Sequence, residues 1–414
     1  MFLTNEEEAM LNGEYGEALE IAISVLVKLG DIYEADRMIE VENAHIDSSS
    51  YFIIGESGLN LCEKFVNLGA TFKVPATLNP LGIDPHRWQE FRVSKSYVEK
   101  QNRLAEAHIS LGGIATWTCA PYQYGANLRF GQNVAWGESN AVVSANSVYG
   151  ARTERLGDLT DICAAVVGKY PRFGLYLNEN RRGQVLFKIE SDKLDVKSFS
   201  YADYAALGFC IGSLAGTRVP VVTEIPKSVT WDQLKDFGAA IATGGSVGLY
   251  HIVGVTPEAR TLSEACGGLK PEEVISIGVD EINETREKLS TTTEVKADII
   301  VLGCPHYSVE QLKRAAIIVK GKKVVEGVEL WIQTSPMAKM LASEMGIIDI
   351  IEAAGGKIHI SGCFTMYNYA QEWGFGTLMT DSAKNAYYSS GITGVEVVFD
   401  DTEKCIEAAT RQRS

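Results

Sequence analysis

Three of the eight cysteines in this 414-residue chain stand where a thiol could meet a ligand. Cys119 lies in a loop punctuated by proline and glycine, just after a short extended run at residues 113–118. Cys304 and Cys363 each follow a hydrophobic run and have a glycine beside them. Three thiolates at strand ends could hold an iron-sulfur cluster and leave one iron open, where it would act as a Lewis acid on a substrate hydroxyl.

A second chemistry is open at the same place. Cys304 could act as a nucleophile with His306 as its base, in a transferase or hydrolase that needs no iron. The spacing of the three cysteines matches no local cluster motif, so the residues alone leave both alternatives open. The other five cysteines fall within helical patterns and are predicted to be buried small hydrophobic residues: Cys62, Cys163, Cys210, Cys266 and Cys405.

Several common signatures are absent from the sequence. There is no phosphate-binding G-x-x-x-x-G-K-[ST], no G-x-G-x-x-G after a strand, no H-E-x-x-H and no G-x-S-x-G. The six histidines are scattered, and no pair has the spacing of metal ligands. These absences argue against nucleotide chemistry and zinc-dependent hydrolysis.

The elements that must position the three thiols alternate between helix and short strand. Helices are expected at residues 6–12, 16–29, 57–68, 94–110, 139–149, 158–168, 201–215, 231–242, 308–319, 336–344 and 401–410, and strands at 38–46, 71–74, 184–189, 246–253, 297–303, 324–334, 357–360 and 395–399. This pattern predicts an α/β fold with mostly parallel sheets. Ligands of such sheets bind beyond the carboxyl ends of the strands, where Cys304, Thr334, Ser335 and Cys363 fall.

The length of the chain predicts more than one lobe. A polar, acidic stretch between about residues 255 and 295 is the best candidate for a boundary. We therefore expect an N-terminal α/β region at residues 1–255, which carries the first cysteine of the trio, and a C-terminal α/β lobe at 256–414, which carries the other two.

The charge balance narrows the range of partners. The net charge is −15 and no basic stripe interrupts it, which argues against nucleic acid or an anionic membrane as a partner. The N-terminus has no signal-peptide pattern, and no run approaches the ~18 apolar residues needed to span a bilayer. The sequence thus predicts a soluble, cytoplasmic protein, in which a disulfide framework is not expected.

A set of motifs spread over the whole chain resembles the catalytic, large part of aconitase X. In chain order these are Ala44-His-Ile-Asp47, Thr77-Leu-Asn-Pro80, Thr118-Cys-Ala-Pro-Tyr122, Gly137-Glu-Ser139, residues 145–153, Gly303-Cys-Pro-His306, Gly362-Cys363 and Thr380-Asp-Ser-Ala-Lys384. The resemblance implies an aconitase-like, multi-lobed α/β body and an iron-sulfur dehydratase acting on a small molecule.

The resemblance also implies roles for individual residues. Cys119, Cys304 and Cys363 match the cluster ligands, with the nuclearity open between 2Fe-2S, 3Fe-4S and 4Fe-4S. The positions expected around the substrate are Ser48, Ser49, Ser50, Asn79, Pro80, Glu138, Ser139, Arg152 and Lys384. Among these, Lys384 is expected to bind the substrate carboxylate, and Glu138 and Ser139 to make polar contacts beside the cluster. Arg152 is expected to be either a second anion contact or part of a structural ion pair.

Two activities compete within the family. One dehydrates cis-3-hydroxy-L-proline to 1-pyrroline-2-carboxylate, and the other dehydrates mevalonate 5-phosphate. Residues 158–165, 379–388 and 394–400 look like the hydroxyproline branch, and the archaeal branch tends to have glycine at the position of Ala383. Because a phosphate would favour basic residues near the serine turn and only Arg37 lies between Lys28 and Lys64, hydroxyproline is preferred. A non-catalytic, cluster-binding protein is a third alternative.

Aconitase-type enzymes also have a small swivelling domain, and the resemblance leaves no part of this sequence to form it. We therefore expect a small subunit on a separate chain, so that the enzyme would be a heterodimer. The general base is not assigned, and it could lie on that partner.

Overall fold

The computed structural model describes residues 1–293 and 296–411 and divides into two compact units. The first comprises Met1–Leu81 and Lys95–Arg182, and the second comprises Gly82–Ser94 and the chain from Gly183 onward. The polar stretch expected to separate two lobes, between about 255 and 295, falls within the second unit; its residues 294 and 295 lie outside the described residues.

The first unit holds two small sheets. Strands β3, β2 and β4 form a parallel three-stranded sheet in that order, and β1 pairs with β5 in antiparallel fashion. The elements are α1 (Asn5–Leu11), α2 (Glu17–Ile32), β1 (Met38–Glu40), β2 (Ala44–Ile46), α3 (Tyr51–Asn67), β3 (Ala76–Leu78), α4 (Lys95–Ser110), β4 (Ala135–Trp136), α5 (Ser139–Val143), α6 (Thr160–Val167) and β5 (Lys169–Pro171). A π-helical turn, Ser144–Val148, continues α5.

Three expectations for the first unit need correction. The strand expected at 38–46 is two strands in different sheets, β1 and β2. The helix expected at 139–149 is the short α5 followed by the π-helical turn. Residues 71–74 are not a strand, because the amides of Phe72 and Lys73 donate to the carbonyls of Leu111 and Ala165 instead of to a neighbouring strand.

The second unit holds two larger parallel sheets, one of four strands in the order β8-β7-β6-β9 and one of five in the order β12-β11-β10-β13-β14. Its elements are β6 (Val185–Ile189), α7 (Tyr201–Ala215), β7 (Pro220–Thr223), α8 (Trp231–Gly245), β8 (His251–Ile252), α9 (Leu262–Ala265), β9 (Glu273–Ile277), α10 (Val279–Leu289), β10 (Ile299–Tyr307), α11 (Val309–Val319), β11 (Glu329–Thr334), α12 (Pro336–Glu344), α13 (Ile347–Ala353), β12 (Lys357–Ile360), α14 (Tyr369–Trp373), β13 (Thr377–Thr380), α15 (Ala383–Thr393), β14 (Glu396–Phe399) and α16 (Thr402–Thr410). The prediction of an α/β fold with mostly parallel sheets is confirmed.

The five-stranded sheet has a topological switch point beside β10. From β10 the chain moves outward to β11 and β12, then returns to the other side of β10 and continues through β13 to β14. The carboxyl ends of β10 and β13 therefore border the crevice in which open α/β sheets bind ligands.

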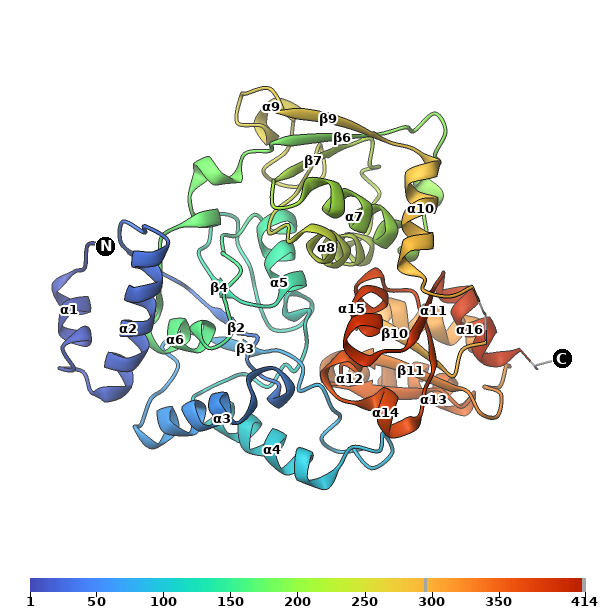
Figure 1. Cartoon of the computed structure of the whole chain (residues 1–414), viewed down its shortest axis with the longest axis horizontal. Helices are drawn as coiled ribbons and strands as arrows, with labels where there is room; N and C mark the ends of the chain where they lie inside the picture. Colours follow the sequence, from blue (N-terminus) through green and yellow to red (C-terminus); the bar gives the residue numbers. More distant parts are fainter. Residues whose placement is uncertain (294–295, 412–414) are drawn as a thin grey trace. The chain divides into compact units, whose positions relative to one another are not determined.

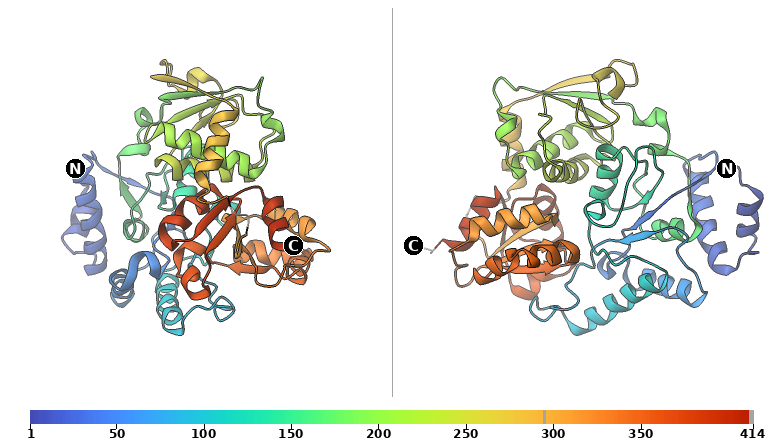
Figure 2. Two further views of the ribbon diagram at one scale, coloured as in Figure 1. Left: turned by 45° about the vertical axis from the view of Figure 1, so that its right-hand side comes forward. Right: turned by 180° about the vertical axis from the view of Figure 1, so that it is seen from behind.

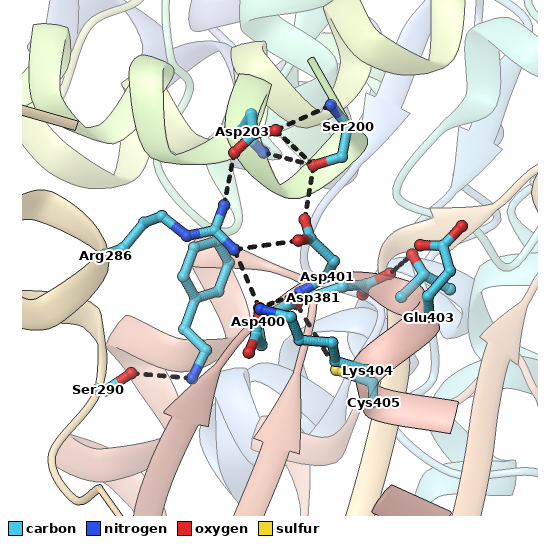
Figure 3. A network of polar contacts seen from close by, with 12 residues as sticks. Ser200, Asp203, Arg286, Ser290, Asp381, Asp400, Asp401, Glu403, Lys404 and Cys405 are labelled. Carbon is cyan, nitrogen blue, oxygen red and sulfur yellow. Dashed lines mark hydrogen bonds and ion pairs between the residues drawn. The ribbon is translucent and has the colours of Figure 1, made fainter. Parts of the chain in front are cut away.

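Helices α7 and α8 pack side by side beside the strands of the four-stranded sheet (Figures 1 and 2). A cluster of charges joins this part of the second unit to the five-stranded sheet (Figure 3). Arg286 of α10 donates to Asp203 in the first turn of α7 at 2.6 Å and to Asp400, just after β14, at 3.1 Å. Asp401 lies 3.4 Å from the same guanidinium. A single side chain thus connects segments that are about 200 residues apart in the sequence.

The segment Gly82–Ser94 joins the second unit far from its neighbours in the sequence. Gly82 forms a parallel bridge with Gly362, and its carbonyl accepts the amide of Cys363 at 3.2 Å. Phe91 is fully buried and stacks on His359, with ring centroids 4.3 Å apart.

Among the residues that the structure describes, no helix is long and apolar enough to cross a bilayer.

Candidate functional site

The parallel sheet of the first unit gathers polar side chains at one edge. Asp47 follows β2, Asn79 follows β3, and Glu138 comes two residues after β4. Because the three strands are parallel, their carboxyl ends lie at the same edge. Two residues predicted to surround the substrate, Asn79 and Glu138, are thereby brought together.

A chain of hydrogen bonds runs along this edge. The imidazole of His45 contacts Thr77 Oγ1 through Nδ1 at 2.9 Å and Asn79 Oδ1 through Nε2 at 3.4 Å. The side-chain nitrogen of Asn79, Nδ2, donates to Asp47 Oδ1. Burial lowers the pKa of His45 to about 4, although the nearby charge of Glu138 opposes the shift, so the ring is neutral at pH 7.

Glu138 and Ser139 form the N-terminal cap of α5. Glu138 accepts the amide of Ala141 at 2.7 Å through Oε2 and the hydroxyl of Ser139 at 3.1 Å through Oε1. Both side chains are almost fully buried. The carboxylate is therefore held at the start of a helix, where the backbone amides favour negative charge.

The serine turn after Asp47 is bonded to the protein itself. Ser48 donates its hydroxyl to Asp161 at 2.7 Å, and Ser49 donates to the carbonyl of Ile46 at 2.9 Å. Ser50 caps α3 by accepting the amide of Phe52. The carboxylate of Asp161 also takes the backbone amides of residues 47 and 48, at 2.6 and 3.2 Å. The predicted position of the turn beside β2 holds, but each hydroxyl has a partner within the chain.

Cys119 lies beside the same edge. The preceding residue, Thr118, donates its amide to the carbonyl of Leu78 at the end of β3, at 3.1 Å. Asn140 of α5 donates to the carbonyl of Cys119 at 2.9 Å. Cys119 as a residue is partly exposed. The structure thus brings Cys119 to the strand ends that carry Asn79 and Glu138.

Pro80 and Arg152 complete the predicted set in this unit. Pro80 is buried directly after Asn79. Arg152 is half-buried and donates to the carbonyl of Tyr176 at 3.2 Å. A neighbouring arginine that the sequence analysis did not single out, Arg181, is 3 % exposed and donates to four oxygens, including the carbonyl of Ala151 at 3.1 Å. Its contacts fix the loop that follows the π-helical turn.

Cys304 and Lys384 lie at the switch point of the five-stranded sheet in the second unit. A small cavity of about 10 Å³, the space of one water molecule, is lined by both of them together with Ala205, Asp236, Ala239, Pro305, Tyr307, Asp381, Ser382 and Ala383. Ser382 caps α15 and donates its hydroxyl to the carbonyl of Cys304. Cys304 of β10 and Lys384 of α15, the helix that follows β13, therefore line the same cavity.

The sequence analysis expected the strand to end at residue 303, so that Cys304 would follow it. In the structure Cys304 lies within β10. The strand continues to Tyr307 but shifts its register against β11 between Leu302 and Tyr307. Gly303 permits the shift: its φ is +92°, and a Cβ there would lie 2.2 Å from the carbonyl oxygen of Gln333. The irregularity leaves Cys304 partly exposed although its neighbours in the strand are buried.

Cys363 lies three residues beyond β12, as predicted. The residue is partly exposed, and its thiol lies 3.3 Å from the hydroxyl of Thr365. The ring of His306, on β10, bonds through Nε2 to the carbonyl oxygen of Gly362 at 2.8 Å. Since a carbonyl only accepts, Nε2 carries the proton. The segments that bear Cys304 and Cys363 are therefore tied together.

A buried lysine supports the first of these segments. Lys235 of α8 is 1 % exposed and donates to the carbonyl of His306 at 2.9 Å and to the side chain of Gln311. Asp232 lies 3.5 Å from its ammonium group. On the β13 side, Asp381 accepts hydrogen bonds from Thr402 and Tyr307, and burial raises its pKa. The sequence analysis did not single out Lys235, because its contact with β10 exists only when α8 packs on that strand.

The eight cysteines separate into two groups as predicted. Cys119, Cys304 and Cys363 are partly exposed, and Cys62, Cys163, Cys210, Cys266 and Cys405 are buried. Burial raises the pKa of Cys62 and of Cys163 to about 12. The partly exposed group is the trio expected to bind iron, with Cys119 in the first unit and the other two in the second. Within the described residues, no three His, Cys, Asp or Glu side chains gather as a metal site.

Comparison with protein families covers nearly the whole chain. Residues 1–179 match the model described as the aconitase X first domain, residues 183–287 the second domain and residues 297–411 the third. The stretch between the second and third matches overlaps the end of the polar region at 255–295.

Characterised relatives and a solved structure agree with these matches. The chain is 40 % identical to the phosphomevalonate dehydratase large subunit of Methanothermobacter thermautotrophicus over 97 % of both sequences. It is 35 % identical to the cis-3-hydroxy-L-proline dehydratase of Pseudomonas aeruginosa over 99 % of this chain, which spans 70 % of that protein. The crystal structure of Thermococcus kodakaraensis aconitase X in its holo form superimposes with a TM-score of 0.89 at 36 % identity, over 99 % of this chain and all of that one.

Proposed function

Since the chain belongs to the aconitase X family and is a dehydratase, a carbon–oxygen lyase, we propose that it is the large subunit of an iron-sulfur enzyme that removes water from a small 3-hydroxy acid. The observation that carries the proposal is the position of the predicted residues. Asn79, Glu138 and Cys119 share one sheet edge, and Cys304 and Lys384 share one switch point. Both are places where α/β sheets bind ligands.

The donor set fits an iron-sulfur cluster. Cys119, Cys304 and Cys363 are the partly exposed thiols, and none of them is in a disulfide. When bound, a cluster with an open iron would supply a Lewis acid for the departing hydroxyl group. The residues of this chain would fix the strand ends that carry the thiols, through the bond from His306 to Gly362 and the bond from Ser382 to the carbonyl of Cys304.

We propose cis-3-hydroxy-L-proline as the substrate. The serine turn is the place where a phosphate could meet backbone amides, but the amides of residues 47 and 48 already donate to the carboxylate of Asp161. An anion at this turn would meet that carboxylate. A substrate whose only anionic group is a carboxylate, with Lys384 as its partner, avoids the repulsion.

Mevalonate 5-phosphate is the second candidate, and the comparisons favour it. Four large subunits of phosphomevalonate dehydratases are 39–40 % identical to this chain and a fifth is 31 % identical, whereas two hydroxyproline dehydratases are 34–35 % identical. Both substrates carry a hydroxyl on the carbon next to that bearing the acidic α-hydrogen. The elimination asked of the site is therefore the same for either one.

A separate small subunit is part of the proposal. Relatives of the same length are named as large subunits, and this chain spans only 68–70 % of the hydroxyproline dehydratases. We propose that this chain, like the relatives named as large subunits, works with a small subunit, so the large chain alone is expected to be inactive or nearly so.

The test is anaerobic turnover by the chain purified with its small subunit, on cis-3-hydroxy-L-proline and on mevalonate 5-phosphate in parallel, with iron measured in the same samples. Turnover of the hydroxyproline that is lost in Cys304→Ser and kept in Cys210→Ala, a buried cysteine in α7, would support the proposal. Turnover of the phosphate alone would assign the second candidate.

Two outcomes would contradict the proposal. Iron with no turnover of either substrate, even with the small subunit present, would leave a non-catalytic cluster-binding protein. A chain that binds no iron, and in which a single thiol reacts rapidly with an alkylating agent, would favour the nucleophile formed by Cys304 and His306.

A further inference from the structure

We propose that two buried side chains, Gln101 of α4 and Asp161 of α6, hold the serine turn (Ser48–Ser50) and its flanking residues in the shape that binds the substrate. Both are positioning residues, since they act through the backbone of the turn. The inference rests on the proposed function and deepens it, because the serines are among the residues predicted to surround the substrate. All of its contacts lie within the first unit.

Asp161 fixes the first half of this segment. Its Oδ2 accepts hydrogen bonds from the backbone amides of Asp47 and Ser48 at 2.6 and 3.2 Å, and its Oδ1 accepts one from the hydroxyl of Ser48 at 2.7 Å. Asp161 is fully buried. One carboxylate therefore determines the direction that the chain takes as it leaves β2.

Gln101 fixes the second half from a different helix. Its Nε2 donates to the carbonyl of Ser49 at 2.9 Å, and its Oε1 accepts a hydrogen bond from the backbone amide of Tyr51 at 2.8 Å. Tyr51 is the first residue of α3, so its amide has no partner within that helix. Gln101 is also fully buried. This position needs a side chain with both a donor and an acceptor, and glutamine is the residue of this length that has both.

The two side chains act on successive residues of the segment that joins β2 to α3. Asp161 holds residues 47 and 48, and Gln101 holds residues 49 and 51, while Ser50 caps α3. Helix α6 packs against β2, and α4 packs against α3. The turn is thus held by one helix that packs on the strand before it and by another that packs on the helix after it.

The shape of the turn affects the edge of the sheet through Asp47 and Asn79. The side chain of Asn79 donates to Asp47 Oδ1, and the backbone amide of Asn79 donates to the carbonyl of Ile46 at 3.0 Å. A change of direction at residue 47 therefore moves a partner of Asn79, which is also predicted to lie beside the substrate. A displacement of about 1 Å at such a position can lower a rate by roughly 100-fold.

A positioning role and a purely structural role make different predictions. A purely structural pair would contribute to the free energy of unfolding and leave kcat and KM unchanged in the enzyme that is folded and loaded with iron. Positioning residues change the kinetic constants of that folded enzyme.

The test uses the complex with its small subunit, assayed on cis-3-hydroxy-L-proline and on mevalonate 5-phosphate, with rates expressed per iron-loaded enzyme. Asp161→Ala and Gln101→Met should each lower kcat/KM by roughly 30-fold or more. The double variant should lose less than the product of the two single losses, because both side chains act on one turn. The controls are Asp158→Ala, just before α6, and Glu106→Ala on α4; both residues are exposed, and both variants should behave as wild type.

Sodium formate tests the role of the missing carboxylate directly. Asp161→Ala leaves space for this anion beside the same two amides and hydroxyl, so formate should restore part of kcat/KM, whereas sodium chloride at equal concentration should not. Asp161→Asn keeps one oxygen for the amides and should lie between wild type and Asp161→Ala. Gln101→Met lacks no carboxylate and should not respond to formate.

Hydrogen exchange in the same complex measures the turn without relying on turnover. The amides of residues 47 and 48 should exchange about tenfold faster or more in Asp161→Ala than in wild type, and the amide of Tyr51 should do so in Gln101→Met. The two control variants should leave all three amides at their wild-type rates.

The proposal is overturned if Asp161→Ala and Gln101→Met both keep kcat/KM within about threefold of wild type, or if their losses follow iron content. Unchanged hydrogen exchange at residues 47–51, or losses that multiply fully in the double variant, would overturn it as well. An Asp161→Ala variant that responds equally to formate and chloride would remove Asp161 from the pair.

Milder variants keep the proposal testable if folding fails. Asp161→Asn replaces Asp161→Ala, and Gln101→Glu, which loses only the donor to Ser49, replaces Gln101→Met; the same criteria apply. A wild-type complex that turns over neither substrate would reject the proposed function itself. That is a different result from an active wild type with equally active variants, which would reject only the role of Gln101 and Asp161.

Discussion

The ring of His306 donates a hydrogen bond from Nε2 to the carbonyl oxygen of Gly362, 2.8 Å away, and both groups are buried. His306 is two residues after Cys304, and Gly362 immediately precedes Cys363. One bond therefore sets the relative position of two strand ends in the same sheet. The backbone carbonyl of His306 is fixed in turn by Lys235.

Removing this bond should loosen both cysteine segments. His306→Leu leaves the carbonyl of Gly362 without its donor, which should cost about 1–3 kcal/mol in the free energy of unfolding. We expect the metal-loaded protein to lose iron to a chelator faster than wild type. His306→Gln, whose NH₂ group can donate at a similar reach, should restore much of the difference. Equal rates of iron loss in wild type and His306→Leu would contradict this role.

Arg286 should stabilise the second unit by joining its two sheets. Its guanidinium bonds to Asp203 and Asp400 and is only 20 % exposed (Figure 3). Arg286→Leu should lower the free energy of unfolding by about 2 kcal/mol, because two carboxylates lose a shared partner. The control is Lys288→Met on the same helix, where the ammonium group is exposed and a change below about 0.5 kcal/mol is expected. Similar effects of the two substitutions would refute the claim.

Stability should fall as the pH drops below 7. Burial lowers the pKa of His45 and of His108 to about 4, and that of His359 to about 3. Unfolding returns each ring to a pKa near 6.5, so the unfolded state binds more protons in this window. The stability that the neutral rings contribute is present above pH 6.5 and is lost as the pH falls through their folded values.

His108→Leu isolates one such contribution. His108 lies in α4, and its Nδ1 donates to the carbonyl of Leu104. Between pH 7 and pH 5 the wild type should lose about 2 kcal/mol more of its unfolding free energy than the variant does, as measured with urea. Asp161 acts in the opposite sense in both proteins, since burial raises its pKa to about 6. Parallel pH profiles for the two proteins would show that folding does not lower the pKa of His108.

Alkylation of the metal-free chain should distinguish the two groups of cysteines. Under anaerobic conditions, Cys119, Cys304 and Cys363 should react within minutes because they are partly exposed, whereas the five buried thiols should react only on unfolding. Loading with iron and sulfide should protect the three together, as peptide mass spectrometry would show. Protection of only one or two of them would remove the others from the proposed ligand set.

The sequence predicted the fold class and most long helices, because their hydrophobic periodicity is local. It did not predict β7, β9 or β13, which are strands of four or five residues. Residues 38–46 looked like one strand because the apolar pattern does not reveal that β1 and β2 pair in different sheets. Strand pairing is set by packing between distant segments, which a single sequence does not display.

The candidate site was predictable in its thiols and only partly in its polar groups. Cys304 and Cys363 stand out in the sequence because each follows a hydrophobic run and has a glycine beside it. Cys119 stands out because its loop is punctuated by proline and glycine, and all three residues are partly exposed. Asp47 had a comparable signal, since it directly follows a buried strand, but its link to Asn79 depends on the order β3-β2-β4. Lys235 resembled a surface residue of an amphipathic helix, and its burial follows from the packing of α8 against β10.

The segment Gly82–Ser94 gives the second unit an unusual order of assembly during synthesis. It leaves the ribosome early, yet its partners Gly362, Cys363 and His359 are made about 270 residues later. At roughly 5–20 residues per second, the segment waits tens of seconds before its final contacts can form. Phe91, which is completely buried in the finished protein, lacks its stacking partner His359 during that interval. The segment around Cys363 contacts residues from the first quarter of the chain. Because Cys363 itself is made late, these contacts can form only when synthesis is nearly over.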